Sequence, residues 1–368
     1  MQFSITLLLR FLLEERYLYS KNIQICYNKT MSMKMNLIRQ ILSYEKEKKK
    51  LTNKKKQNTK DIYKSLSIND SARKAPQSIA KFVMRDIETS PIIIENTPCL
   101  HFRMKKNRKY FAKTTPQKDT TVFYIHGGGF CSGFAEQGIY LIKVLMKNFG
   151  CDCIAAKYSL SPEYIFPKAL DELEKIYYKI KKQYKNIIIL GESAGSNLAI
   201  ALMKRLKSKR KTLPSCAILP SGFYDLSREC FCHKENEKSD VSLSNNQLKY
   251  MGLLYAFGEN IGPDMDYEIL QNPLISPVYA KLTGFPPLFF SVCKDEILYD
   301  DTIEMVKNCQ RDNVKYVLHE SKKCFHAFGI LGDFFPESSK VTKEVIKFIV
   351  NNTDLKISYS NYSIKKKA

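Results

Sequence analysis

The chain has 368 residues, of which 44% are hydrophobic, and its formal net charge at pH 7 is +22. The hydrophobic content is enough for a sizeable core, although the chain is long for one compact domain. Most of the excess positive charge lies in residues 1–115, without interleaved aromatic residues or a nucleic-acid-binding motif. We therefore interpret it as a solvated face and expect no nucleic-acid partner; contact between the basic N-terminus and an anionic membrane surface is the less favoured alternative.

Residues 1–35 are an N-terminal extension of uncertain role. Their apolar run, residues 5–13, contains Arg10, is too short to span a bilayer, and is followed by no small-residue cleavage pattern. Because no secretory signal is expected and the cysteine count is eleven, an odd number, the thiols are expected to be reduced. These features favour a cytoplasmic location over a membrane-associated or secreted one.

Residues 36–85 form a basic segment that opens with an amphipathic stretch. Its apolar positions are Leu37, Ile38, Ile41 and Leu42, a spacing that is typical of a helix with one buried face.

The first motif with chemical content is an apolar strand, Val122–Ile125, that runs into His126 and three glycines. Successive glycines let a loop turn its backbone N–H groups inward toward a small oxygen atom. A phosphate-binding loop would require a following Lys-Ser/Thr pair, and none is present. The pattern therefore predicts an oxyanion hole, with its donors among the backbone amides of Gly127, Gly128, Gly129 and, further along the chain, Ala194.

The second motif is Gly191-Glu192-Ser193-Ala194-Gly195, which follows the apolar run Ile187–Leu190 and precedes a helical stretch. A sharp turn from strand to helix with glycine on both sides of a serine is typical of a nucleophile elbow, which exposes the hydroxyl beside the first helical amides. We interpret Ser193 as a nucleophile.

A serine nucleophile needs a general base, and the chain contains five histidines. His326 lies in a loop between a predicted strand, residues 315–318, and the last helix, at the sheet edge where catalytic side chains gather. We favour His326 over the others, which lie before the core motifs, in the glycine loop, in a charged insertion or at a strand end: His101, His126, His233 and His319.

The acid that orients the histidine should follow another buried strand. Residues 287–293 form such a strand, and Asp295 comes directly after it. Asp295 is the predicted partner of the Nδ1–H group of His326. Asp300 and Asp301 are rivals in the same loop, although they are better placed to cap the helix that follows.

Together these motifs resemble the α/β-hydrolases of the hormone-sensitive lipase group, which includes arylacetamide deacetylase and many bacterial carboxylesterases. The matching segments span about residue 88 to residue 352 and also include Tyr158–Glu163 and Phe166–Ala169. The resemblance implies an α/β fold with a mostly parallel sheet, a structural role for His126, an accepted Glu192 before the nucleophile, and Asp295 as the acid. It departs at Ser159 and Ser161, where relatives usually have Arg and Ala.

The resemblance also implies the division of the chain. Residues 86–352 form the catalytic domain with a lid insertion at about 225–270, residues 36–85 are part of the lid, and residues 353–368 are a basic tail. Relatives of this group often pair, so a homodimer is one option.

The expected activity is hydrolysis of carboxylic esters with small to medium acyl chains through an acyl-serine intermediate. Two alternatives remain open: an amidase or deacetylase of the same fold, and a non-catalytic receptor for a small ligand, as in the plant gibberellin receptors. No metal or organic cofactor is expected. The cluster from Cys230 to His233 is the one place to test for zinc, although its one-residue cysteine spacing is unlike that of a zinc pair.

Overall fold

The computed structural model describes residues 32–53, 83–105, 119–227, 235–262 and 265–357. Residues 1–31, the cluster from Cys230 to His233 and the end of the C-terminal tail lie outside the described residues, so the predictions for them stay untested.

Eight strands form one sheet in the order β1-β2-β4-β3-β5-β6-β7-β8. The β1–β2 and β2–β4 pairs are antiparallel, and every pair from β4 to β8 is parallel. The mostly parallel sheet confirms the predicted fold class. In chain order the strands are β1 (Ile87–Ile94), β2 (Thr97–Met104), β3 (Thr120–Ile125), β4 (Asp152–Ala156), β5 (Asn186–Gly191), β6 (Cys216–Pro220), β7 (Leu288–Cys293) and β8 (Tyr316–Ser321).

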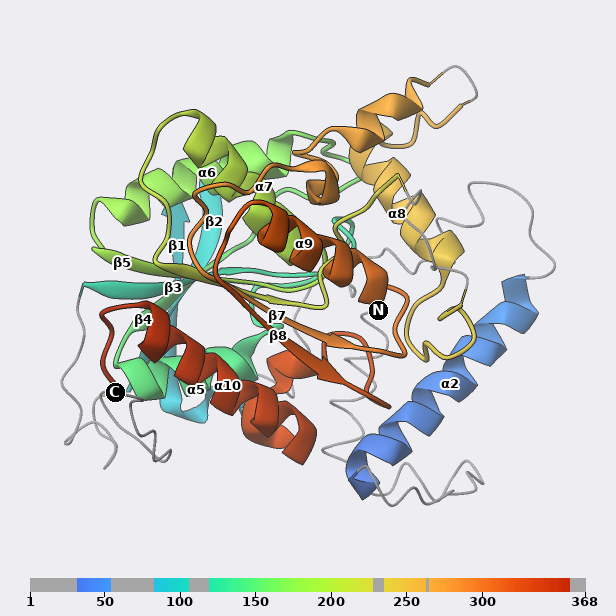
Figure 1. The fold of residues 1–368 in the computed structure, drawn as a ribbon, viewed down its shortest axis with the longest axis horizontal. Helices are drawn as coiled ribbons and strands as arrows, with labels where there is room; N and C mark the ends of the chain where they lie inside the picture. The colour runs from blue at the N-terminus through green and yellow to red at the C-terminus, as the bar shows by residue number, and fades with distance from the viewer. Residues whose placement is uncertain (1–31, 54–82, 106–118, 228–234, 263–264, 358–368) are drawn as a thin grey trace.

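Helices cover both faces of this sheet (Figure 1). The α-helices are α2 (Met33–Asn53), α5 (Ile139–Phe149), α6 (Lys168–Lys181), α7 (Ala194–Ser208), α8 (Asn245–Phe257), α9 (Tyr299–Arg311) and α10 (Pro336–Asn352). Short 3₁₀ segments are η3 (Val83–Asp86), η5 (Tyr267–Gln271), η6 (Pro277–Tyr279) and η7 (Phe328–Phe334).

The central strands read as unbroken apolar runs because both of their faces are buried. In β3, Phe123 and Ile125 pack into the cluster formed with α6, α7 and α9. Val122 and Tyr124 point the other way, into the cluster formed with α5 and α10. This alternation follows from the two-residue period of a strand.

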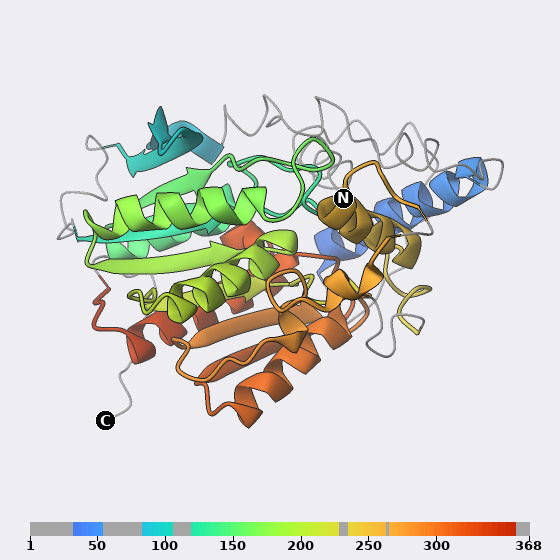
Figure 2. The same ribbon diagram turned by 90° about the horizontal axis from the view of Figure 1, so that it is seen from above.

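The N-terminal helix α2 joins the second of these clusters through Met35, Ile38 and Leu42, which are all buried. This is the amphipathic helix predicted from residues 37–42. Figure 2 shows α2 and α8 together at one end of the sheet, and Figure 1 agrees. Among the described residues, no helix is long and apolar enough to cross a membrane.

Candidate active site

The turn after β5 has the geometry of a nucleophile elbow. Ser193 adopts a backbone conformation with positive φ, with φ 53° and ψ −119°, and α7 starts at the next residue. A Cβ atom at Gly191 would lie 2.4 Å from the Gly195 carbonyl oxygen, and one at Gly195 would lie 2.0 Å from the Ile125 carbonyl oxygen. Glycine is therefore required on both sides of the serine, and the strained serine conformation is held in place by packing.

The glycine loop after β3 lies directly beside this elbow. Gly128 and Gly129 have positive φ angles of 117° and 61°, and a Cβ atom at Gly127 would lie 3.1 Å from the Ser193 Cβ atom. No hydrogen bond within the described part of the chain takes up the N–H groups of Gly128, Gly129 or Ala194. These three amides are thus available to a bound oxygen atom.

The prediction that Gly127 belongs to the oxyanion hole is wrong. Its N–H group donates to Glu192 Oε1 at 3.2 Å, so it is already used inside the protein. The same Glu192 oxygen accepts a hydrogen bond from Gln137 Nε2 at 2.5 Å. Glu192 therefore joins the elbow to the glycine loop. Burial raises the pKa of this carboxyl group to about 7, against the opposing effect of the hydrogen bond from Gly127.

The His126 side chain packs against the glycine loop. Its ring stacks on Tyr158 with 4.3 Å between ring centroids, and Nδ1 lies 2.7 Å from the Gly127 carbonyl oxygen. Tyr158 also donates from its hydroxyl group to the His126 carbonyl oxygen. Burial lowers the pKa of His126 to about 4, so the ring is neutral at physiological pH.

The acid beside His326 is Glu296, and the prediction of Asp295 is wrong by one residue. Glu296 Oε2 lies 2.8 Å from His326 Nδ1, and both side chains are 1% exposed. Asp295 instead has a side chain that is 30% exposed, accepts a hydrogen bond from the Lys323 N–H group, and lies 3.9 Å from Arg39. The physical reason is the tight turn after β7. The Glu296 N–H group donates to the Cys293 carbonyl oxygen, so the chain reverses there and the side chain of residue 296 is the one that reaches the histidine.

Sequence reasoning missed Ser221, which connects the parts of the site. The Ser221 hydroxyl group donates to Glu296 Oε1 at 2.7 Å and accepts from the Ala327 N–H group at 3.1 Å. The preceding residue, Pro220, accepts a hydrogen bond from the Ser193 N–H group at 3.0 Å. Elbow, acid and histidine loop therefore meet at the end of β6. No sequence motif marks this serine, because its role depends on strands that are far apart in the chain.

His326 uses only one of its two ring nitrogens within the protein. Nδ1 faces Glu296, whereas Nε2 is buried and has no hydrogen-bond partner among the described residues. A buried, unpartnered nitrogen is uncommon and is expected at a site that binds a reacting group. A carboxylate on Nδ1 leaves Nε2 as the basic nitrogen of the neutral ring.

The other two described histidines outside this site have partners of their own. His101 Nε2 lies 3.0 Å from Asp152, and His319 Nδ1 lies 3.0 Å from Glu344. Asp301, the other candidate acid, is buried and accepts hydrogen bonds from Tyr224 and Asp225 N–H groups. None of these three side chains faces His326.

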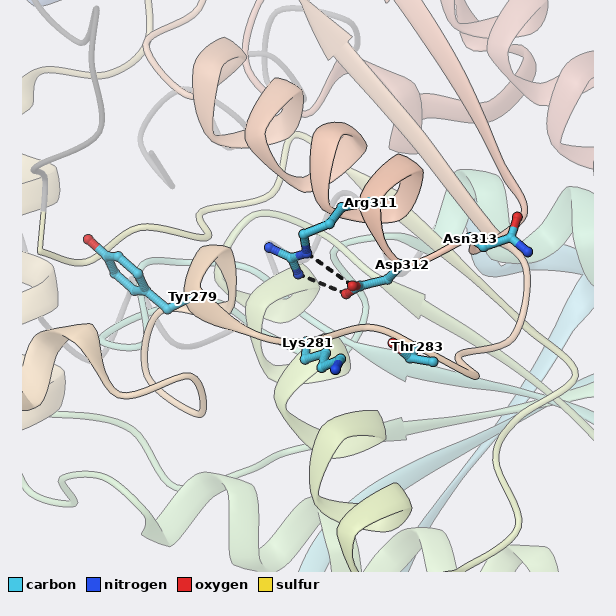
Figure 3. Close-up of a pocket in the computed structure, with 6 residues that line it drawn as sticks. All are labelled: Tyr279, Lys281, Thr283, Arg311, Asp312 and Asn313. Atoms are coloured by element: carbon cyan, nitrogen blue, oxygen red, sulfur yellow. Dashed lines mark hydrogen bonds and ion pairs between the residues drawn. The ribbon is translucent and has the colours of Figure 1, made fainter.

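A separate hollow of about 640 Å³ lies at the opposite edge of the sheet, before the amino ends of β7 and β8 (Figure 3). Its one guanidinium, Arg311, is already bound to Asp312 at 2.8 Å and to Asn308 at 2.8 Å. It therefore offers no free cation from that residue and contains none of the predicted site residues. Within the described residues there is also no group of three or more His, Cys, Asp or Glu side chains that would hold a metal ion.

A serine on a strand-to-helix elbow, with acid and histidine after later strands at the carboxyl edge of a parallel sheet, defines the α/β-hydrolase class. Comparison with known proteins agrees: residues 122–330 match the model of a family described as the alpha/beta hydrolase fold. The chain belongs to that family.

Three relatives are similar over most of the catalytic domain. An esterase of Acinetobacter venetianus is 30% identical over 230 residues, which are 62% of this chain and 73% of the relative. An acetyl-hydrolase of Streptomyces hygroscopicus is 26% identical over 236 residues, which are 63% of this chain and 76% of the relative. A crystal structure of a hormone-sensitive lipase from a metagenome library has 26% identity and a TM-score of 0.63, covering 81% of this chain and 99% of that one. The resemblance to the hormone-sensitive lipase group is confirmed.

Proposed function

We propose that this protein is a carboxylic ester hydrolase in which Ser193 is the nucleophile, His326 the general base and Glu296 the acid. The observation that carries the proposal is the buried pair of Glu296 and His326. The second ring nitrogen of His326, Nε2, has no hydrogen-bond partner among the described residues. The loop that carries His326 is bonded to the end of β6, as is Ser193. The names of the relatives, esterase and acetyl-hydrolase, support the same reaction class.

The reaction proceeds by acyl transfer in two steps. His326 Nε2 takes the proton of the Ser193 hydroxyl group as the oxygen attacks the ester carbonyl carbon. The histidine then gives this proton to the leaving alcohol, and the acyl group stays on the serine. Water enters, loses a proton to the same nitrogen, and releases the acid. Glu296 holds the tautomer and stabilises the imidazolium that forms in both steps.

The negative charge that develops on the carbonyl oxygen is stabilised by the amides of Gly128, Gly129 and Ala194. These donors are fixed before the substrate arrives, so no reorganisation accompanies the step. The N-terminus of α7 adds a partial positive charge at the same place. No cofactor takes part in this mechanism.

We further propose that α2 and α8, the helix in the described part of the predicted lid insertion, form the lid over this site. The lid helix α8 supports this assignment, because a Cβ atom at Gly129 would lie 2.2 Å from Met251 Sδ. Its Tyr255 ring stacks on Phe130 at 4.0 Å, which ties the helix to the catalytic body. A lid in this position limits the space for the acyl chain and favours short acyl groups.

A panel of p-nitrophenyl esters from acetate to laurate tests the proposal, with p-nitroanilides of the same acids in parallel. We expect hydrolysis of the shorter esters and at least tenfold slower turnover of the anilides. A fluorophosphonate should label the native protein at Ser193, and Ser193→Ala should remove both labelling and turnover without changing the thermal melt. Faster anilide turnover would favour an amidase, and absence of labelling and turnover would favour a receptor.

A further inference from the structure

The backbone of the turn that carries the acid is held by a segment from a distant part of the chain. Asn236 Nδ2 donates to the carbonyl oxygens of Lys294 and Glu296, each at 2.9 Å. The Ser239 hydroxyl group donates to the Asp295 carbonyl oxygen at 2.9 Å. These three bonds bind three consecutive carbonyl groups of residues 294–296.

The next residue of the turn, Ile297, is held through its N–H group instead of its carbonyl group. The Ile297 N–H group donates to Asp240 Oδ2 at 2.9 Å. The other oxygen of this buried carboxylate accepts from the Ser242 and Leu243 N–H groups, at 2.6 and 2.9 Å, so it fixes its own segment as well. Asn236, Ser239 and Asp240 therefore bind four successive residues around Glu296, and we call these three residues the acid clamp.

Helix α2 binds the acid clamp from outside. Lys46 Nζ donates to the carbonyl oxygens of Glu237 and Asp240, at 3.0 and 2.5 Å. About two helical turns earlier, Arg39 donates to the carbonyl oxygen of Cys324, two residues before His326. The N-terminal helix thus contacts both the clamp and the histidine loop.

Two hydrogen bonds hold the acid within its own turn. Within residues 293–297 the turn has a bond from the Glu296 N–H group to the Cys293 carbonyl oxygen, at 3.1 Å, and one from the Cys293 N–H group to Glu296 Oε1, at 3.0 Å. Glutamate has one more rotatable bond than aspartate, so fixing its carboxylate costs more conformational entropy, and a mobile backbone would add to that freedom. Four extra bonds to neighbouring main-chain groups supply that restraint.

We propose that Asn236, Ser239 and Asp240 are positioning residues, which keep the Glu296 carboxylate against His326 Nδ1, and that α2 reinforces them through Lys46. This inference rests on the proposed function and adds to it: part of the proposed lid insertion serves the catalytic acid rather than substrate entry. Because none of these residues reaches the substrate-facing nitrogen of His326, the clamp acts on the rate of the chemical step and little on substrate binding.

Three alanine substitutions in residues 236–239 provide the test. Asn236→Ala removes two of the clamp bonds and should lower kcat about tenfold, with KM within about twofold of the native protein, since small misplacements of catalytic groups have large effects on rate. Ser239→Ala removes one bond and should give a smaller loss of kcat. Lys238→Ala, at an exposed residue between them, is the matched control and should leave both constants unchanged.

A double-mutant cycle separates positioning of the acid from general destabilisation. In a Glu296→Gln background the clamp has no carboxylate to position, so adding Asn236→Ala should change kcat by less than about twofold. The inference is overturned if Asn236→Ala keeps native kcat, or if its full effect persists in the Glu296→Gln background. If the melt shows that Asn236→Ala does not fold, Ser239→Ala is read through the same cycle with the same criteria.

The outcome for the native protein keeps this inference distinct from the proposed function. If the native protein neither hydrolyses esters nor reacts with a fluorophosphonate, the proposed function fails. If the native protein is active and the clamp variants match the Lys238→Ala control, the function stands and the acid clamp is wrong.

Discussion

Two adjacent carboxylates follow β7, and their surroundings differ in ways that separate their roles. Glu296 is buried and contacts His326, whereas the Asp295 side chain is 30% exposed and faces the N–H group of Lys323. A carboxylate that stabilises an imidazolium must be close to the ring and shielded from water, because solvent weakens the interaction. Only one of the two meets both conditions.

The first prediction compares isosteric changes at these two positions. Glu296→Gln should lower kcat on a short p-nitrophenyl ester by a hundredfold or more, on the order of the loss seen when a triad acid is replaced by its amide. Asp295→Asn, the control, should stay within about fivefold of the native rate. Steady-state kinetics of both variants decide the matter, and the reverse order of effects would restore Asp295 as the acid.

Glu192 provides a pH-dependent contribution to stability. Its pKa in the folded protein is raised by burial to about 7 from an ordinary value of 4.5, so the folded state binds a proton that the unfolded state has lost between these values. The contribution of this group to the free energy of unfolding is therefore present below about pH 4.5 and is lost as pH rises through 7.

The second prediction removes this titration with Glu192→Gln, which stays neutral at every pH. The difference in the free energy of unfolding, variant minus native, should grow in favour of the variant as pH rises from 5 to 8. The expected growth is up to about 3 kcal/mol. Urea denaturation at the two pH values measures the change, with Glu259→Gln at an exposed site as control. Equal pH dependence in all three proteins would show that Glu192 is ionised in the folded state at both pH values.

At the scale of secondary-structure elements, helix α8 packs against the glycine loop. Met251 and Leu254 of this helix pack with Cys131, just after the glycine loop. Leu254 and Tyr255 of the same helix are buried, and the Tyr255 ring stacks on Phe130 of the catalytic body. Met251 of the same helix lies against the glycine loop, because a Cβ atom at Gly129 would lie 2.2 Å from its Sδ atom.

The third prediction concerns acyl-chain length. Met251→Ala should raise kcat/KM for octanoate relative to butyrate several-fold, because a shortened side chain beside Gly129 leaves room for additional methylene groups. Ratios of kcat/KM across the p-nitrophenyl series measure this change. Lys249→Ala, at an exposed residue of the same helix, should keep the native ratio. An unchanged ratio in Met251→Ala would place the acyl chain elsewhere.

At the scale of the whole molecule, the N-terminal helix is part of the core. Its buried face joins the cluster that contains α5, α10 and one face of the sheet. The charged side chains Arg39 and Lys46 extend from the same helix to the histidine loop and the acid clamp. Stability and site geometry are thus connected through one element that precedes the catalytic domain in sequence.

The fourth prediction tests this connection through stability. Leu42→Ala removes a side chain that is 4% exposed and should lower the free energy of unfolding by about 2–5 kcal/mol, the usual range for a buried leucine. Tyr44→Ala, at a residue of the same helix that is 52% exposed, is the control and should have little effect. Calorimetric melts of the full chain compare them; equal melting temperatures would mean that α2 is not part of the cooperative unit.

The local motifs carried most of the prediction of fold and site. The steric requirement for glycine at Gly191 and Gly195, the apolar strands before each motif and the order of serine, acid and histidine depend on short stretches of chain. Such features can be read without knowing what lies nearby in space. They predicted the mostly parallel sheet, the elbow at Ser193 and the location of His326 in a loop at its edge.

The sequence by itself determined the class of protein, because steric limits at glycine and the burial of strands on both faces act within a few residues. Only the tertiary structure decided which of two neighbouring carboxylates faces His326, that Gly127 gives its amide to Glu192, and that Ser221 joins the parts of the site. The physical reason is that these choices depend on hydrogen bonds between segments 65 to 106 residues apart, or on a turn held by such a segment. No local pattern fixes the direction of a side chain whose partners come from other strands.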